Sequence, residues 1–192
     1  EKLQDKIIIG WGLNWRYAAD TPTNEYCGLM TIPRKLALVN TPRGLRLSSS
    51  PIDSLWAAAE PCGIIVREKA LTTGSFALRI EGDGEFTISF SNDDGEKLSF
   101  GINSNNEIFL DRSIAGDTSF SEVFASELFS KVVKERFFTG PFTMDAIFDV
   151  SMLEVFCDNG TFACALNVYP KRPYSKIAYI GDVKISHGDL RT

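Results

Sequence analysis

Asp149 and Glu154 are the carboxylates whose positions come closest to those of an acid–base pair in this sequence. Paired carboxyl groups can share the roles of proton donor and proton acceptor when they face one site. These two lie on neighbouring strand-like segments, where alternation places them on opposite faces. We therefore expect structural roles: Asp149 satisfies backbone groups of a turn, and Glu154 pairs with a neighbouring cation. Asp111-Arg112 is likewise interpreted as a structural turn pair.

Four cysteines and one histidine are the other candidate ligands and nucleophiles. Cys27, Cys62, Cys157 and Cys164 include no C-x-x-C pair and match no zinc pattern, so we predict no metal site and no cofactor. We expect four free, buried thiols, and these do not decide the redox compartment. His187, near the C-terminus, is expected to be a solvated surface residue.

Composition indicates a folded protein. Of the 192 residues 44% are hydrophobic and 23% are charged, and the net charge is −5. Lys and Arg form no basic stripe, which argues against nucleic-acid binding, and no apolar run approaches the ~20 residues of a membrane span. Residues 1–6 are charged and no apolar stretch of a signal peptide follows them. The signal of a secreted parent protein would therefore lie upstream.

The dominant pattern is that of β-strands separated by Gly, Asn, Asp and Pro. In residues 86–90, Phe86, Ile88 and Phe90 alternate with polar residues, as in a strand with one buried face. Many short antiparallel strands at this spacing predict an all-β fold, an antiparallel β-sandwich. The predicted strands are residues 6–11 (fully buried), 26–32, 35–39, 45–48, 63–68, 75–81, 84–91, 97–103, 107–111, 142–148, 152–156, 162–169, and finally 176–180 and 182–186 as a last hairpin or edge pair.

Turn residues divide these strands. Residues 41–44, 82–84, 92–95 and 103–106 are predicted turns. Asp158-Asn159-Gly160 is a predicted hairpin turn that sets Cys157 opposite Phe162 and Cys164 opposite Val155, so the two cysteines are not direct partners.

Two segments depart from the strand pattern. Residues 50–61 are small, Ala-rich and bounded by prolines, which predicts a domain junction. In residues 119–135, Phe120, Phe124 and Leu128 are spaced for one face of a helix. The local pattern therefore favours a helix there.

Residues 9–38 resemble the last propeller-blade stretch of glycoside hydrolase family 32, the invertase, inulinase and levanase family. That stretch typically contains G-W-x-x-N-W-x-Y, P-T and G-x-M-T-I-P-R-x-L-x-L, and this chain departs from it at Tyr26-Cys27, where Trp-Arg is usual. The matching residues are Gly10, Trp11, Asn14, Trp15, Tyr17, Pro22, Thr23, Gly28, Met30, Thr31, Ile32, Pro33, Arg34 and Leu36.

A second segment, residues 108–160, resembles the family's F-x-D-R-S and I-F-x-D-x-S-x-x-E-x-F-x-N-D-G steps, with departures at Val150 and in the order Asp158-Asn159. The resemblance spans nearly the whole chain, loosely over residues 48–74. It implies a jelly-roll-like sandwich over residues 49–192, preceded in residues 1–48 by the final, incomplete strands of the catalytic propeller. It also favours an irregular covering loop, rather than a helix, in residues 119–135.

The resemblance implies retaining hydrolysis of fructan or sucrose in the intact enzyme, by two carboxyl groups about 5 Å apart. In the family these groups lie on an N-terminal five-bladed propeller, in W-M-N-D-P-N-G and E-C motifs, with a further Asp in R-D-P. None of these motifs occurs here, so we predict no catalytic residue and an inactive isolated chain. The implied partner is the propeller, and the implied location is extracellular or periplasmic.

Trp11 is the residue to which the resemblance gives a functional place, at the floor of the fructose pocket. A flat aromatic face suits the apolar face of a sugar ring, whereas a structural interpretation makes Trp11 a core residue at a blade edge. Asn14 and Trp15 are expected to line the same region, chiefly as supports, and Tyr17 and Arg34 to make packing and strand-end contacts. Trp11, Asn14 and Trp15 are thus the predicted substrate-binding residues of the intact enzyme.

Two other roles remain open on the sequence. A β-sandwich of this kind could bind carbohydrate on its own, as a lectin-like module, or it could supply a homodimer surface. Fold class alone does not decide between these roles and that of an enzyme's structural module.

Overall fold

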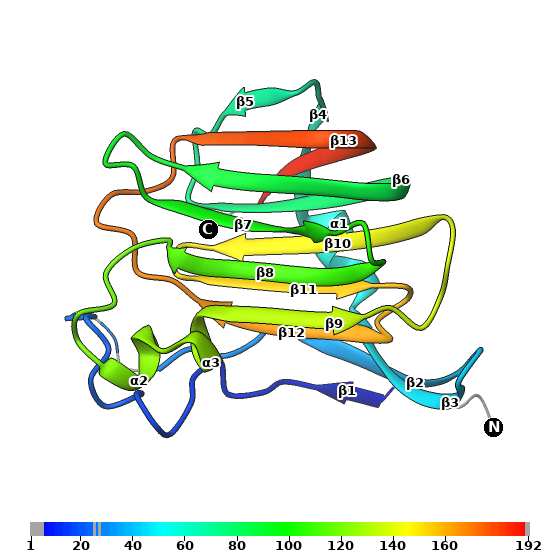
Figure 1. Ribbon diagram of the computed structural model, residues 1–192, viewed down its shortest axis with the longest axis horizontal. Coiled ribbons are helices and arrows are strands. Elements are labelled where there is room, and N and C mark those ends of the chain that lie inside the picture. Colours follow the sequence, from blue (N-terminus) through cyan, green and yellow to red (C-terminus); the bar gives the residue numbers. More distant parts are fainter. Residues whose placement is uncertain (1–5, 25, 27, 191–192) are drawn as a thin grey trace.

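Two long strands, β6 (Ser75–Ser91) and β13 (Lys176–Leu190), organise the computed structural model, which describes residues 6–24, 26 and 28–190. They pair with each other along most of their length and run through both layers of an antiparallel sandwich. The first half of β6 pairs with β10 and the second half with β7. The fold is therefore the predicted all-β sandwich (Figure 1).

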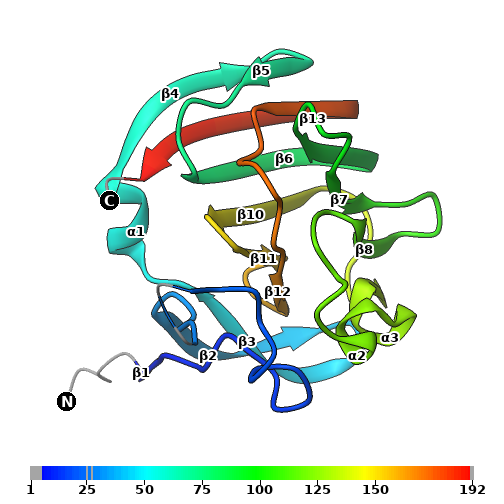
Figure 2. The same ribbon diagram turned by 90° about the vertical axis from the view of Figure 1, so that its left-hand side faces the viewer.

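The two layers are continuous with each other through β6 and β13, as Figure 2 shows from the side. One layer runs in the order β12 (Phe162–Asn167), β11 (Met152–Cys157), β10 (Phe142–Asp149), the first half of β6, the second half of β13 and β4 (Ala59–Ile65). The other runs β9 (Lys131–Glu135), β8 (Glu107–Ile114), β7 (Lys97–Ile102), the second half of β6, the first half of β13 and β5 (Glu68–Ala70).

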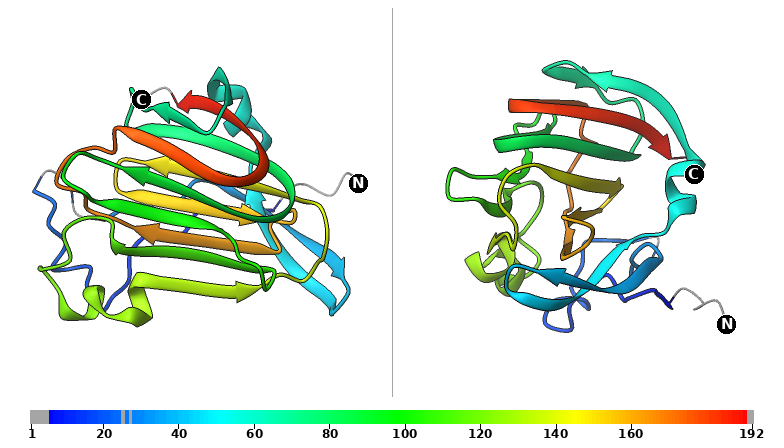
Figure 3. Two further views of the ribbon diagram at one scale, coloured as in Figure 1. Left: turned by 45° about the horizontal axis from the view of Figure 1, so that its top comes forward. Right: turned by 90° about the vertical axis from the view of Figure 1, so that its right-hand side faces the viewer.

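Glycines form the corners where these strands change layer, and here two predictions were wrong. Residues 82–84 are not a turn, and residues 176–180 and 182–186 are not a hairpin or edge pair. Each segment is one continuous strand with a register shift between Gly181 and Val183. A Cβ on Gly82 would lie 2.7 Å from Val183 Cγ1, and Gly181 has φ +117°. Glycine permits this close crossing and bend, since strands that switch sheets do so at bends and bulges. Figure 3 shows the curl of β13 (orange to red).

The core follows the predicted alternation. Phe86, Ile88 and Phe90 are at most 2% exposed, whereas the intervening Thr87 and Ser89 are partly exposed. Aromatic rings from both layers meet in the centre. Phe90 makes edge contacts with Phe76, Phe100 and Phe148.

The segment predicted as a helix or a covering loop contains neither over its whole length. It forms two short helices, α2 (Glu122–Ala125) and α3 (Glu127–Ser130), and then strand β9. Phe124 is buried against Tyr17 and Tyr169, while Leu128 is 73% exposed. One turn of helix gains little by itself, so tertiary packing of Phe124 decides the local structure.

The first strands form a separate three-stranded sheet in the order β1 (Lys6–Ile8), β2 (Arg34–Thr41) and β3 (Gly44–Pro51). The predicted turn at residues 41–44 is confirmed, with Gly44 at φ +90°. The predicted buried strand at residues 6–11 is wrong about burial, since β1 is exposed. Residues 26–32 form no strand among the residues described, beyond an isolated bridge between Met30 and Trp11. β1 remains exposed because no other described segment packs over it.

The predicted junction at residues 50–61 contains the short helix α1 (Asp53–Ala58), which leads into β4. No helix in the described ranges is long and apolar enough to cross a membrane.

The predicted cysteine register is confirmed, because Cys157 lies opposite Phe162 and Cys164 opposite Val155. Cys62, Cys157 and Cys164 are free thiols, and Cys27 lies outside the described residues. Burial was expected for all, but Cys62 is exposed and Cys164 is only partly buried. Desolvation of the Cys164 thiol raises its pKa to about 11.

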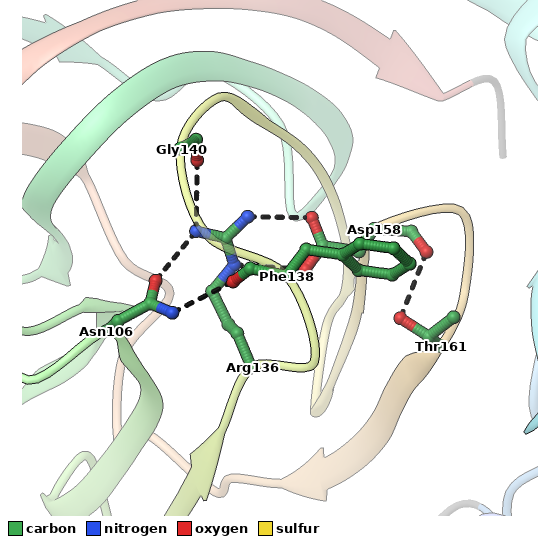
Figure 4. Close-up of polar contacts among 6 residues, drawn as sticks. All are labelled: Asn106, Arg136, Phe138, Gly140, Asp158 and Thr161. Atoms are coloured by element: carbon green, nitrogen blue, oxygen red, sulfur yellow. Dashed lines mark hydrogen bonds and ion pairs between the residues drawn. The ribbon is translucent and has the colours of Figure 1, made fainter. Parts of the chain in front are cut away.

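Arg136 and Asp158 form a buried ion pair beneath the loops that connect strands of the sandwich (Figure 4). Arg136 donates from Nε and Nη2 to the two carboxylate oxygens of Asp158, at 3.0 and 2.9 Å, and from Nη1 to Asn106 Oδ1 at 2.8 Å. It also donates to the carbonyl of Gly140. Asn106 in turn donates to the carbonyl of Phe138. The network ties three connections between strands to one guanidinium.

Replacing Asp158 with Asn should lower the free energy of unfolding by about 2–4 kcal/mol, because it leaves Arg136 buried without a counter-charge. Asn tolerates the left-handed conformation of this position, φ +52°, so the variant isolates the charge. The matched control is Glu135→Gln, which breaks the exposed Arg43–Glu135 pair and should change little. Urea unfolding of both variants measures the difference, and equal losses would contradict the assignment.

Candidate functional site

Trp11 and Trp15 form an aromatic pair on the surface of the N-terminal segment. Their ring centroids lie 4.5 Å apart with a 56° angle between planes. Trp11 is 39% exposed and Trp15 is 87% exposed. Met30, bridged to Trp11, is also exposed. The structure therefore brings together two of the three predicted sugar-contacting residues and leaves their rings accessible.

Backbone contacts fix Trp11 from both sides. Gly10 accepts a hydrogen bond from the Thr31 amide at 2.9 Å, and its own amide donates to Thr31 Oγ1 at 2.9 Å. On the other side, Gly12 lies so close to the sandwich that a Cβ there would be 2.9 Å from Met152 Sδ. Because Gly10 and Gly12 have no side chain, the backbone on either side of Trp11 can approach Thr31 and Met152 closely.

Asn14 builds the turn that presents Trp15. Its Oδ1 accepts the Arg16 amide at 3.0 Å, and its carbonyl accepts the amides of Tyr17 and Ala18 at 3.1 and 2.9 Å. An Asn side chain commonly stabilises a turn in this way. The side-chain oxygen of Asn14 is engaged inside the turn.

Glu154 on β11 joins this N-terminal segment to the sandwich. The residue is 1% exposed, and its carboxylate accepts the Ile32 amide at 2.7 Å. Arg34, at the start of β2, donates to it from Nε at 3.0 Å and also from Nη2. The Arg34 guanidinium lies over the Phe156 ring at 5.0 Å. The predicted pairing of Glu154 with a cation and the strand-end role of Arg34 are both confirmed.

Burial raises the pKa of Glu154, and the hydrogen bonds from Ile32 and Arg34 act in the opposite direction. The expectation that Asp149 lies on the opposite face is wrong: Glu154 pairs with Ile147 and Asp149 with Met152, so both carboxylates share one face of the sheet, and the charge of Asp149 also raises the pKa of Glu154. Asp149 is exposed and accepts a 2.6 Å hydrogen bond from Ser75 Oγ. That bond corrects the expectation that its side chain serves turn backbone groups. The two carboxylates have separate structural partners.

The predicted Asp111-Arg112 turn pair is wrong, because both residues lie in strand β8 at a register shift against β7. Asp111 accepts the amide and hydroxyl of Ser113 within that strand. Arg112 is instead buried. It donates to the Phe124 carbonyl at 2.6 Å, with its guanidinium 3.5 Å from the ring centroid of Phe124. Desolvation lowers the pKa of Arg112 to about 10.

Two further side-chain bonds attach the N-terminal segment to the sandwich. The Tyr17 hydroxyl donates to Asn167 Oδ1 at 3.2 Å, and the hydroxyls of Tyr26 and Ser151 lie 3.0 Å apart. Tyr17 is buried, as expected of a packing residue.

Strand β3 lies on the hairpin turn at Gly160. The Ser49 amide donates to the Gly160 carbonyl at 2.8 Å, and a Cβ on Gly160 would lie 2.3 Å from the Ser49 carbonyl oxygen. With φ +78°, this position requires glycine both for the turn and for the contact. The N-terminal sheet therefore packs directly on the β11–β12 turn.

The N-terminal segment also carries many exposed apolar side chains. The register of β1, β2 and β3 places Ile8, Leu38, Leu45 and Leu47 on one face of the sheet and Ile7 on the other. Exposed apolar surface of this kind usually marks an interaction site. We call the following set the N-terminal apolar face: Ile8, Ile9, Trp11, Trp15, Met30, Leu38, Leu45 and Leu47, which are between 39% and 87% exposed.

A cleft of about 780 Å³ lies where the segment meets the sandwich. Pro22 and Tyr26 line it from the segment, and Thr73, Val150 and Lys171 line it from the sandwich. It offers both aromatic and polar groups to a ligand.

Residues 43–187 match the family described as glycosyl hydrolases family 32 C terminal. The chain belongs to this family. Of the curated relatives, a levanase of Bacillus sp. (strain L7) is 26% identical over 86% of the chain and 20% of its own length. An extracellular exo-inulinase of Aspergillus awamori is 29% identical over 88% of the chain and 34% of its own length. The chain thus spans 20% and 34% of the length of these two relatives.

Solved structures agree on the fold. The crystal structure of the Aspergillus awamori exo-inulinase superposes with a TM-score of 0.86 at 24% identity, covering 100% of this chain and 41% of that one. A fructofuranosidase of Schwanniomyces occidentalis, complexed with fructosylnystose, gives 0.78 at 17% identity, covering 97% and 45%.

Arg34→Met should release the N-terminal segment, because it leaves Glu154 buried without its cation. We expect a loss of about 3–5 kcal/mol in unfolding free energy and faster hydrogen exchange at the Ile32 amide. The control is Arg79→Met, which breaks an ion pair with Asp145 inside the sandwich and should leave Ile32 exchange unchanged. Unaltered protection of Ile32 in Arg34→Met would refute the anchoring role.

Proposed function

We propose that this chain is the C-terminal region of a retaining β-fructosidase that hydrolyses fructan or sucrose, and that it braces the N-terminal catalytic propeller of that enzyme. The observation that carries the proposal is the N-terminal apolar face. Glu154 ties the segment that carries these residues to the sandwich through Ile32 and Arg34, yet no described segment covers the exposed side chains. The names of the relatives, a levanase and an exo-inulinase, support the substrate class.

The exposed side chains are accompanied by an open backbone edge. In the described residues, β1 pairs with β2 alone, so its other edge has free amides and carbonyls. An apolar, unpaired edge strand is prone to pair with another chain. A further strand of the propeller would satisfy both the edge and the face.

The domain boundary is part of the proposal. Residues 1–48 would complete the propeller and residues 49–192 would form the sandwich module. Two features support a boundary close to this point: β1, β2 and β3 form their own sheet, which ends with β3 at Pro51, and the connection to the sandwich passes through α1. The propeller carries the catalytic carboxyls, and the isolated chain is inactive.

Within the intact enzyme, Trp11 would contact the fructosyl ring, with Trp15 and Asn14 shaping the same region. The support is geometric, since an accessible indole fixed by backbone bonds at both neighbours is a rigid, flat apolar surface. A preoriented aromatic ring binds a sugar face at little entropic cost.

In the full-length parent enzyme, Trp11→Ala should lower kcat/KM for sucrose or fructan by about tenfold or more, a loss of roughly 1.4 kcal/mol in transition-state binding. Trp11→Phe, which keeps a flat ring, should retain most activity. Ile180→Ala is the control, because Ile180 is 80% exposed on the sandwich. Equal activity of Trp11→Ala and Ile180→Ala would exclude the pocket role.

The isolated chain should self-associate through the N-terminal apolar face. Light scattering should show an average mass that rises with concentration, and Ile8→Lys with Leu47→Lys should return it to that of a monomer. Val66→Lys, at an exposed apolar site on the sandwich, should not. A monomeric wild-type chain would contradict the uncovered face, and a closed dimer of fixed mass would favour a dimerisation module.

The cleft beside Tyr26 favours a second candidate function, carbohydrate binding by the chain itself. Calorimetric titration of the chain with levan and inulin tests it. Saturable heat that Tyr26→Ala removes would support a binding module, and no heat at millimolar sugar would exclude it.

A further inference from the structure

Cys62, His187 and Asp189 converge at the edge of the sandwich, on β4 and β13. One side-chain atom of each, the thiol sulfur, an imidazole nitrogen and a carboxylate oxygen, lies within 4.8 Å of the others. These strands lie at the opposite end of the molecule from the N-terminal sheet (Figure 1). The cluster is therefore separate from the N-terminal apolar face.

A β-bulge creates this cluster. His187 pairs with Gly63 and Gly188 pairs with Pro61, so Cys62 is the extra residue on β4. Gly63 takes φ +90° to accommodate it. Bulges of this kind redirect a side chain, and here the thiol joins His187 and Asp189, which share a face because they are two residues apart.

His187 provides a second, independent observation. Its side chain is 2% exposed, contrary to the expected surface position, and Nε2 lies 3.3 Å from Asp189 Oδ1. Nε2 nevertheless has no hydrogen-bond partner in the described structure. A buried polar atom without a hydrogen bond is costly, so Nε2 is a candidate to bind a further group. The second ring nitrogen, Nδ1, lies 2.8 Å from Lys69 Nζ.

We propose that Cys62, His187 and Asp189 bind a zinc ion. Thiolate, imidazole nitrogen and carboxylate oxygen are the ligands that zinc takes in proteins, and three protein ligands leave a fourth position for water. The thiolate and the carboxylate balance the charge of the ion. Thr73 donates to Asp189 Oδ1 at 3.2 Å, which orients the carboxylate as an outer-shell partner does.

Binding requires two proton movements, and Lys69 controls one of them. The Cys62 thiol releases its proton to solvent and gives up its hydrogen bond to the Glu60 carbonyl. With the Lys69 ammonium donating to Nδ1, the neutral ring of His187 carries its proton on Nε2. The Lys69 side chain must turn away so that this proton can move to Nδ1, leaving Nε2 to bind the ion. Lys69 therefore competes with zinc.

The ion would link the edge strand β4 to β13, since Cys62 lies on β4 and the other two ligands lie on β13. In the described residues β4 pairs with no strand other than β13 and therefore lies at the edge of the sheet. An ion bound by both strands would stabilise the folded chain by mass action. The sequence predicted no metal site because Cys62 lies far from His187 and Asp189 along the chain.

The test is titration of the metal-free full chain with Co²⁺, followed by competition with Zn²⁺. We expect one cobalt ion per chain and a thiolate-to-cobalt charge-transfer band, displaced by zinc. Cys62→Ser should abolish the band and weaken zinc binding by at least about tenfold. Cys62 is exposed, so the variant should fold normally. Cys164→Ser is the matched control and should keep both band and affinity.

Two more variants test the other ligands. Asp189→Asn should weaken zinc binding, and Lys69→Met should strengthen it, because Nδ1 is then free to hold the proton. The proposal is overturned if no charge-transfer band forms, if the band survives in Cys62→Ser, if Asp189→Asn leaves zinc affinity unchanged or if Lys69→Met fails to raise zinc affinity.

Discussion

The buried carboxylate of Glu154 fixes the N-terminal segment to the sandwich. It accepts a backbone amide from Ile32 and two hydrogen bonds from Arg34, so one side chain sets both the position of the segment and the direction in which β2 leaves it. Removing either partner would leave an uncompensated group in a place that water does not reach. Because this contact joins the segment to the sandwich, it sets how the aromatic pair and the N-terminal apolar face are oriented relative to the sandwich.

The sandwich beneath this contact owes its shape to two strands that cross between layers. β6 and β13 bend at glycines, and their pairing makes one continuous sheet that closes on an aromatic core. β11, which carries Glu154, lies between β10 and β12 in the layer beside the N-terminal sheet. The sandwich therefore contacts the N-terminal sheet through β11 and β12, and β4 lies at another edge of the sandwich.

Much of this could be predicted from local pattern. The alternation in β6 and the Gly160 turn follow from the neighbouring residues, and both are confirmed. The pairing of Glu154 with a cation is also confirmed, but its partner Arg34 lies far along the chain and local pattern did not identify it. The continuous run through Gly82 could not be predicted, because glycine marks a turn and a corner equally well, and the partner at Val183 lies far along the chain. The burial of His187 was missed for the same reason, since its surroundings come from β4 and β5.

The central claim is that the apolar face of β1, β2 and β3 is an internal surface of a larger enzyme. Hydrogen exchange of this chain, measured alone and within the full-length parent, tests it most directly. The account predicts that the amides of Ile7 and Ile8 become strongly protected in the parent, while those of the β6 core, such as Ile88, exchange equally slowly in both. Equal and rapid exchange of Ile7 and Ile8 in the two proteins would contradict it.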